Sequence, residues 1–272
     1  MNENPVIGVF DSGFGGLTVL RALLSRIPHA RYAFLGDTAR LPYGSKSRRT
    51  IARYAAESAQ FLMREQGAEY LVIACNTASA LALDAIQDAV PVPVLGVIEP
   101  GAASARAASE SGDVLVIATD ATVQSHAYAA ACRAQGLRAL EKACPLLVPL
   151  VEEGWTRHPV TDQVFRIYLD ELLHQAAEEG MSPDTLVLGC THYPLLRPLI
   201  AQAVPAGMRV IDSAEATADA AMRLFSQRCE DCPAPSNQIR CFATDSVEKF
   251  ERLGSSFLER PVGHVELIDL GG

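Results

Sequence analysis

The sequence predicts an α/β protein of two similar lobes, each a parallel, doubly wound sheet flanked by helices. Short apolar strands alternate with amphipathic helices along most of the chain, as in a parallel sheet covered on both faces. One strand–turn–helix segment recurs about 115 residues later. The length of 272 residues is sufficient for two modest domains.

The individual elements follow from hydrophobic periodicity. Strands are expected at Val6–Phe10, Tyr32–Leu35 and Tyr70–Ala74, and helices at Leu17–Ile27, 47–66 and Ala78–Ala89. The apolar face of the 47–66 helix consists of Ile51, Tyr54, Ser58, Phe61 and Leu62. In parallel sheets, ligands bind beyond the carboxyl ends of the strands. We therefore expect the functional residues at those ends.

The second half of the chain resembles the first. The matching pairs are LVIACNTAS (71–79) with LVLGCTHYP (186–194), IGVFDSGFGG (7–16) with VLVIATDATV (114–123), and VLGVIE (94–99) with MRVID (208–212). We therefore expect one lobe from residues 1–98 with 213–272 and a second from residues 99–212. Pseudo-twofold symmetry would relate the two lobes and place the active site between them.

Composition and charge restrict the partners. The net charge is −9 and the basic residues are scattered, which argues against binding to nucleic acid or to an anionic membrane surface. The N-terminus lacks the basic start and apolar core of a signal peptide, and apolar runs such as residues 143–151 are too short to span a bilayer. A cytoplasmic protein that acts on a small molecule is expected.

The repeat gives two of the seven cysteines equivalent positions. Cys75 precedes Asn76 and Thr77, and Cys190 precedes Thr191 and His192. In a reducing compartment we do not expect a disulfide framework.

The remaining cysteines are assigned no function. The Cys229-x-x-Cys232 pair could be half of a zinc site or a redox pair, but no second such pair accompanies it, which favours a loop with incidental thiols. Cys132, Cys144 and Cys241 are assigned to packing.

Several thiol chemistries fit poorly. A phosphatase-like loop needs an arginine six residues after its cysteine, whereas Arg197 comes one residue late. A cysteine protease built on Cys190 and His192 would leave Cys75 without a role. The same three residues are too few for a structural zinc site. There is no phosphate-binding glycine motif, and no lysine follows a strand, as pyridoxal phosphate chemistry would need.

The chemistry that uses both thiols is stereoinversion without a cofactor. One thiolate removes a proton from a carbon atom, and a thiol on the opposite side returns one. Free cysteine has a pKa of about 8.5, so each thiol requires a neighbour that assists proton transfer. Asp11 and His192 are the candidates. Backbone amides and hydroxyls at the helix starts could bind the substrate carboxylate.

Five motifs together resemble those of the glutamate racemases: FDSGFGG, GDTARLPYG, ACNTAS, PLVEEG and GCTHYP. The resemblance extends over residues 7 to 217. It implies a cofactor-independent isomerase without a metal, with a two-domain α/β fold, commonly a homodimer. It also implies interconversion of L- and D-glutamate for peptidoglycan synthesis.

The resemblance also implies roles for individual residues. Cys75 and Cys190 would exchange protons, assisted by Asp11, His192 and Glu152, with Glu153 as the less favoured alternative. The residues expected to bind substrate are Asp11, Ser12, Tyr43, Gly44, Asn76, Thr77, Thr119, Thr122, Thr191 and His192. Asp37 is expected to be structural or to lie behind the site.

Simpler roles stay open for several of these residues. Gly13, Gly15 and Gly16 could form only a tight turn, and Tyr43 could fix a loop. Asn76 and Thr77 could be helix caps. His126 and His174 are expected on helix surfaces.

Three other classes of protein share some of these features. Aspartate racemases usually have Thr-Glu after the second cysteine, whereas this chain has Thr-His. Related decarboxylases keep one of the two cysteines. A two-lobed binding protein is the rival from outside the enzymes, and reactive thiols argue against it.

Overall fold

The computed structural model describes residues 4–225 and 238–271, and these divide into two compact units. The first comprises the chain up to Val97 and again from Ala214, and the second is Ile98–Ser213. Both boundaries differ by one residue from the expected ones. Cys229 and Cys232 lie outside the described residues. In the described ranges, no helix is long and apolar enough to cross a membrane.

The first unit is built on a parallel sheet with the strand order β10-β9-β2-β1-β3-β4. Its strands are β1 Val6–Asp11, β2 Arg31–Gly36, β3 Tyr70–Ile73, β4 Val94–Gly96, β9 Ile239–Ala243 and β10 Val265–Leu267. Every residue of β1 and β3 is buried, because helices cover both faces of the sheet. The C-terminal strands β9 and β10 extend the sheet beyond β2.

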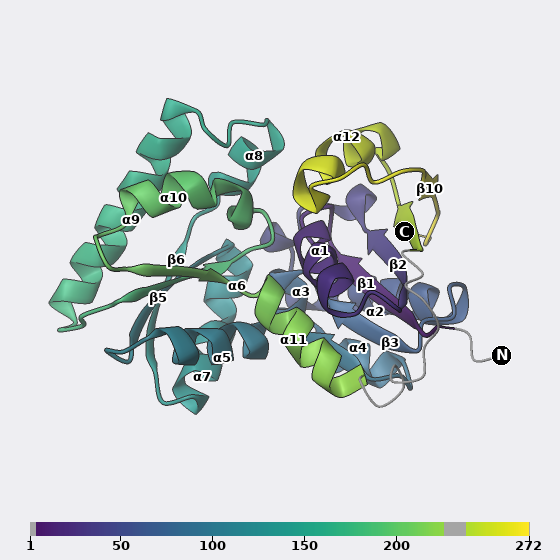
Figure 1. Cartoon of the computed structure of the whole chain (residues 1–272), viewed down its shortest axis with the longest axis horizontal. Coiled ribbons are helices and arrows are strands. Elements are labelled where there is room, and N and C mark those ends of the chain that lie inside the picture. Colours follow the sequence, from purple (N-terminus) through teal and green to yellow (C-terminus); the bar gives the residue numbers. More distant parts are fainter. Residues whose placement is uncertain (1–3, 226–237, 272) are drawn as a thin grey trace. The chain divides into compact units, whose positions relative to one another are not determined.

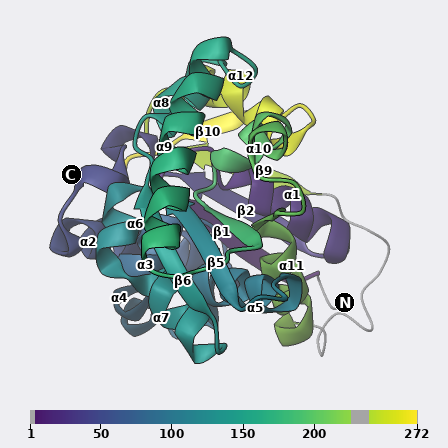
Figure 2. The same ribbon diagram turned by 90° about the vertical axis from the view of Figure 1, so that its left-hand side faces the viewer.

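Helices lie on both sides of this sheet, as Figure 2 shows. One group packs around α1 and comprises α1 Leu17–Arg26, α11 Ala214–Phe225 and α12 Val247–Leu258. The other packs around α2 and comprises α2 Arg48–Arg64, α3 Asn76–Leu81 and α4 Leu83–Ala89. Two short 3₁₀ helices, η1 Thr38–Arg40 and η2 Tyr43–Ser45, connect β2 to α2.

The prediction of one helix over Ala78–Ala89 is wrong, because two helices occupy this region. They meet at Ala82, whose backbone leaves the helical region with φ −136° and ψ 3°. Ala82 is fully buried and neither glycine nor proline marks the break. The helical pattern of apolar residues therefore continues through the break at Ala82 and does not reveal it.

The second unit contains a parallel sheet with the strand order β6-β5-β7-β8. Its strands are β5 Asp113–Ala118, β6 Arg138–Ala143, β7 Thr185–Gly189 and β8 Arg209–Asp212. In Figure 1, α5 Ile98–Ala108 and α7 Ala127–Ala134 lie below this sheet, and α9 Pro159–Glu178 and α10 Arg197–Ala203 lie above it. The shorter elements are α6 Asp120–Ser125, α8 Leu147–Glu152 and η3 Tyr193–Leu196.

The predicted fold class is confirmed, since both sheets are parallel and flanked by helices. The strand order β2-β1-β3-β4 in the first unit matches β6-β5-β7-β8 in the second. The repeated sequence segments fall on the matching strands. Cys75 follows β3 and Cys190 follows β7, so the two thiols occupy equivalent positions in the two topologies.

His126 is not an ordinary helix-surface residue, contrary to the expectation. It lies between α6 and α7 in the left-handed conformation, with φ 55°, and ends α6. Its side chain is largely exposed and its Nδ1 lies 3.1 Å from the Glu141 carboxylate. His174 lies on the exposed surface of α9, as expected.

Gly36, at the end of β2, gives a first testable prediction. A Cβ atom there would lie 2.1 Å from the carbonyl oxygen of Gly13 and 2.7 Å from the ring of Phe250. We expect Gly36→Ala to lower the free energy of unfolding by about 3 kcal/mol, because backbone atoms would have to move apart. Urea-induced unfolding measures this difference.

Gly67→Ala is the matched control for this prediction. Gly67 has φ 67° and nothing within 4 Å of its added Cβ, so only the conformational penalty of about 1 kcal/mol applies. Equal losses of stability in the two variants would contradict the steric explanation for Gly36.

Candidate active site

The first group of candidate residues surrounds Cys75, at the carboxyl ends of β1 and β3. The Cys75 thiol donates a hydrogen bond to Ser12 Oγ at 3.4 Å, and its sulfur accepts one from the backbone N–H of Ala78 at 3.4 Å. Asp11 is buried and its Oδ2 accepts a hydrogen bond from the Gly13 N–H at 2.9 Å. The paired ends of adjacent strands therefore hold a thiol, a hydroxyl and a carboxylate.

Gly16 is required by close packing beside this group. Its φ of −61° is open to any residue, so a special turn conformation does not explain the glycine. A Cβ atom at this position would lie 2.6 Å from Asp11 Cβ and 2.8 Å from Ala74 Cβ. A side chain at residue 16 would thus displace the carboxylate and the strand end that precedes Cys75.

The surroundings of Cys75 favour the neutral thiol. Burial, together with the nearby Asp11 carboxylate, raises the pKa of Cys75 to about 12, against smaller opposing effects of Ser12 and Ala78. Cys75 is therefore a proton donor at neutral pH. Asp11 stands beside it as a group that can accept a proton.

Asn76 and Thr77 are not helix caps, so that alternative is wrong. Cys75 itself is the N-cap residue of α3, and Asn76 and Thr77 are the first two helical residues. Both residues are buried.

The second group surrounds Cys190, directly after β7. The Cys190 sulfur lies 4.0 Å from His192 Nδ1, so residues two apart do meet in the turn after the strand. His192 Nε2 lies 3.3 Å from Glu152 Oε1, within ion-pair distance. Glu152 is the last residue of α8, whereas Glu153 is exposed. The geometry thus brings Glu152, and not Glu153, to the imidazole.

His192 is held in its protonated form. Burial opposes the charge, but Cys190 and Glu152 outweigh it and raise the pKa of His192 to about 10. An imidazolium next to a sulfur atom stabilises negative charge on that sulfur. The two thiols therefore have neighbours of opposite charge, Asp11 for Cys75 and His192 for Cys190.

The other polar candidates of the second unit also lie at strand ends. Thr119 is the N-cap of α6, directly after β5, and its hydroxyl lies 2.9 Å from that of Thr122. Thr191 is buried between Cys190 and His192.

Sequence reasoning missed the role of Tyr193. Its buried hydroxyl lies within hydrogen-bond distance of the carbonyl oxygens of Ala118, at 3.2 Å, and Cys144, at 3.0 Å. Tyr193 thereby fixes the turn after Cys190 to the ends of two neighbouring strands. The sequence around Tyr193 does not predict these contacts, because their partners are 75 and 49 positions away in the chain.

Tyr43 and Gly44 belong to η2, near the end of β2. The Tyr43 side chain is buried and its hydroxyl donates a hydrogen bond to Asp37 Oδ2 at 2.5 Å. Burial, followed by the charge of Asp37, raises the pKa of Tyr43 far above its ordinary value, so the phenol stays a donor. Tyr43 therefore fixes its loop, while Gly44 is partly exposed.

The described residues contain no cluster of three or more histidine, cysteine or acidic side chains arranged to hold a metal ion. Within those residues, Cys75, Cys132, Cys144, Cys190 and Cys241 are all free and buried. Among them, Cys75 follows β3 near the Asp11 carboxylate, and Cys190 follows β7 with its sulfur 4.0 Å from His192 Nδ1.

Known proteins resemble this chain in both sequence and fold. Residues 17–221 match the family model described as Asp/Glu/Hydantoin racemase. The chain is 52% identical to a glutamate racemase of Koribacter versatilis, with 99% of each chain covered.

Two solved glutamate racemases have the same fold. One from Bacillus anthracis is 35% identical, with 99% of each chain covered and a TM-score of 0.89. One from Francisella tularensis, solved in complex with D-glutamate, is also 35% identical over 99% of each chain, with a TM-score of 0.87. The sequence resemblance is thereby confirmed, and the chain belongs to the glutamate racemases, isomerases of the Asp/Glu/Hydantoin racemase family.

Proposed function

We propose that this protein interconverts L- and D-glutamate by a two-base mechanism in which Cys75 and Cys190 act on the α-carbon. The observation that carries the proposal is the pair of buried thiols at equivalent strand ends, one beside a carboxylate and one beside an imidazolium. Proton removal by one group and proton return by another inverts the carbon without any change of oxidation state.

The proton balance is complete in each direction. In one direction the Cys190 thiolate takes the α-proton while the Cys75 thiol donates its own proton to the opposite face of the carbon. The product then leaves a Cys190 thiol and a Cys75 thiolate, which is the state that the opposite enantiomer requires. Asp11 assists by accepting a proton from Cys75, and His192 assists by stabilising negative charge on the Cys190 sulfur. A positioned acid or base contributes about 10²–10⁴ in rate.

We infer that glutamate is the substrate, since the relatives bear that name and one was solved with D-glutamate. The Thr191–His192 pair after the second cysteine supports glutamate over aspartate. The proposed binding residues in the first unit are Asp11, Ser12, Tyr43, Gly44, Asn76 and Thr77. Those in the second unit are Thr119, Thr122, Thr191 and His192.

The wider proposal follows from family membership. The enzyme would need no cofactor, would form a homodimer in the cytoplasm, and would supply D-glutamate for peptidoglycan and thus for the cell wall. The domain organisation proposed for this reaction is one lobe for each thiol.

The purified protein should bring pure L-glutamate and pure D-glutamate to the same equal mixture, measured by circular dichroism or polarimetry. The assay is run in a chelator without added cofactor, with aspartate as the comparison substrate. Failure of the two starting solutions to converge would overturn the proposed function. Faster racemisation of aspartate would overturn the substrate assignment alone.

A further inference from the structure

Asp37 occupies a buried position directly after β2, beside the first group of site residues. Its backbone N–H donates a hydrogen bond to the carbonyl of Asp11 at 3.0 Å. Its side chain is fully buried. A buried carboxylate is costly unless several donors surround it, so the partners of Asp37 indicate what it does.

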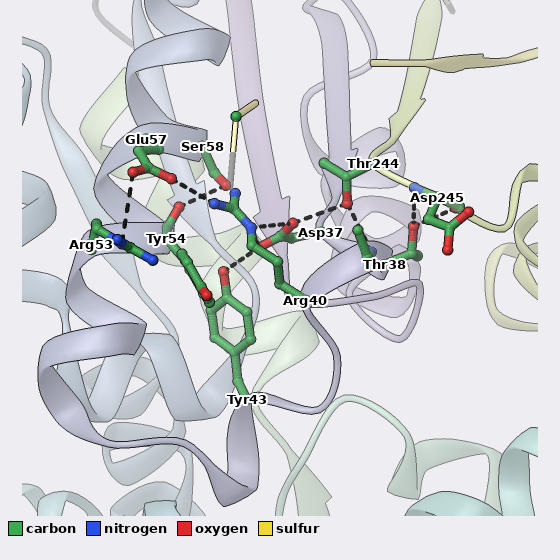
Figure 3. A network of polar contacts seen from close by, with 12 residues as sticks. Asp37, Thr38, Arg40, Tyr43, Arg53, Tyr54, Glu57, Ser58, Thr244 and Asp245 are labelled. Atoms are coloured by element: carbon green, nitrogen blue, oxygen red, sulfur yellow. Dashed lines mark hydrogen bonds and ion pairs between the residues drawn. The ribbon is translucent and has the colours of Figure 1, made fainter. Parts of the chain in front are cut away.

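Side chains from three places donate to both carboxylate oxygens, as Figure 3 shows. Arg40 Nε donates to Oδ1 at 2.9 Å and to Oδ2 at 2.8 Å. Tyr43 Oη donates to Oδ2, and Thr244 Oγ1 donates to Oδ1 at 2.9 Å. An ionised carboxylate only accepts hydrogen bonds, so this set of donors matches it. Tyr43 and Thr244 hold opposite oxygens, and rotation of the carboxylate would disturb both.

Arg40 connects this carboxylate to α2. Its Nη1 donates to Glu57 Oε2 at 2.5 Å, and its guanidinium lies 4.2 Å from the centre of the Tyr54 ring. The Tyr54 ring in turn lies beside the Tyr43 ring, with a centroid distance of 6.2 Å. The Asp37–Arg40 ion pair is thus fixed on a long helix by a second ion pair and a cation–π contact.

Thr244 brings in the C-terminal part of the chain. Its Oγ1 accepts a hydrogen bond from the Ala39 N–H at 2.9 Å, and its backbone N–H donates to the Gly36 carbonyl at 3.2 Å. Next to it, Thr38 Oγ1 accepts from the Asp245 N–H at 2.9 Å and donates to the Asp245 carbonyl. The residues that directly follow β9 are therefore hydrogen-bonded to the chain on both sides of Asp37, although more than 200 positions separate the partners in sequence.

We propose that Asp37 is a positioning residue for the loop that carries Tyr43 and Gly44, and that Thr244 fixes the orientation of its carboxylate. The inference rests on the proposed function, in which this loop contacts glutamate. Neither residue touches the reacting carbon. A misplaced loop weakens ground state and transition state equally, so KM rises while kcat is preserved.

Thr244→Val tests this inference, because valine keeps the shape and removes the hydroxyl. We expect KM for both enantiomers to rise about tenfold, as for the loss of one hydrogen bond to a charged group, with kcat within about twofold of wild type. Thr244→Ser restores the hydroxyl and should restore KM. The matched control is Thr217→Val on α11, where the fully buried hydroxyl has no hydrogen-bond partner within the described chain and KM should not change.

Tyr43→Phe removes the donor on the other oxygen and closes a double-mutant cycle. Because both hydroxyls act through one carboxylate, the double variant should raise KM by less than the product of the single effects. An unchanged KM in Thr244→Val, a fall in kcat without a rise in KM, or multiplicative effects in the double variant would each overturn the proposal. If Thr244→Val does not fold, Tyr43→Phe alone must still show the KM-selective loss, and its absence would count against the inference.

A measurement without turnover separates this inference from the proposed function. In protein labelled with ¹³C at the phenol carbon of tyrosine, the Tyr43 signal is identified by its absence in Tyr43→Phe. That signal should shift in Thr244→Val and return in Thr244→Ser, because the hydrogen bond to Asp37 is altered and restored. A wild-type protein that does not racemise glutamate would refute the function, whereas an unmoved Tyr43 signal would refute the positioning role.

Discussion

Cys75→Ala and Cys190→Ala are each expected to lower kcat for racemisation by at least about 10³-fold in both directions. Each direction needs one thiol as the base and the other as the acid, so losing either stops inversion. Each variant keeps one base, and that base can still exchange the α-proton of one enantiomer. Proton NMR in D2O should show exchange of one enantiomer with Cys75→Ala and of the other with Cys190→Ala.

Two further cysteines provide controls for the same atomic change. Cys241 in the first unit and Cys132 in the second are buried and free, and neither stands at a strand end beside the site. Cys241→Ala and Cys132→Ala should keep kcat close to wild type, apart from the modest loss of stability that truncation of a buried side chain causes. Complete racemisation by Cys75→Ala or Cys190→Ala would refute the two-base assignment.

His192→Asn is expected to lower kcat/KM by about 10²-fold, because the positive charge beside Cys190 is lost while the side-chain shape is roughly kept. In the wild type, the pKa of His192 is raised to about 10, so activity that depends on the imidazolium should fall as the pH rises through 10. The pKa of Cys75, at about 12, lies above this range. The profile of kcat/KM between pH 6 and 11 should show this fall in wild type and lack it in the variant.

His174→Asn is the control, since His174 is exposed on α9 and its side chain lies 3.3 Å from Glu178. It should keep both the rate and the pH profile. A profile of His192→Asn that still falls near pH 10 would assign that ionisation to another group.

The same raised pKa has a consequence for stability. A histidine whose pKa rises on folding stabilises the folded state fully below its ordinary pKa, and this contribution disappears as the pH rises through the folded-state value. The difference in free energy of unfolding between wild type and His192→Asn should therefore be largest below about pH 6.5 and shrink as the pH approaches 10. Urea titrations at several pH values measure it.

Local sequence was sufficient for the strands and for the position of the thiols. Apolar runs ending in Cys75 and Cys190 predicted two parallel strands, and β3 and β7 are found there. The break at Ala82 was missed, since an alanine within a helical pattern gives no signal of a bend. The choice between Glu152 and Glu153 depends on how α8 ends, which the pattern of two adjacent acids does not encode.

The contacts of Asp37 mark a different limit. A carboxylate after a strand indicates a site or a cap, but Thr244 lies 207 positions further along the chain. Its side chain reaches Asp37 only because β9 adds to the sheet beside β2. Such pairings follow from the strand order, and no window of sequence contains both partners.

The unlike neighbours of the two thiols have a thermodynamic consequence. Mirror-image glutamates have equal free energy in water, so detailed balance requires kcat/KM to be identical for the two directions in wild type and in every variant. The contrast between Asp11 and His192 can therefore appear only as a difference in kcat between the two directions that an equal factor in KM offsets. These differences reflect how the enzyme divides between its two protonation states at saturation. An asymmetric pair of acid and base groups biases the resting form of the catalyst while leaving the final mixture of enantiomers untouched.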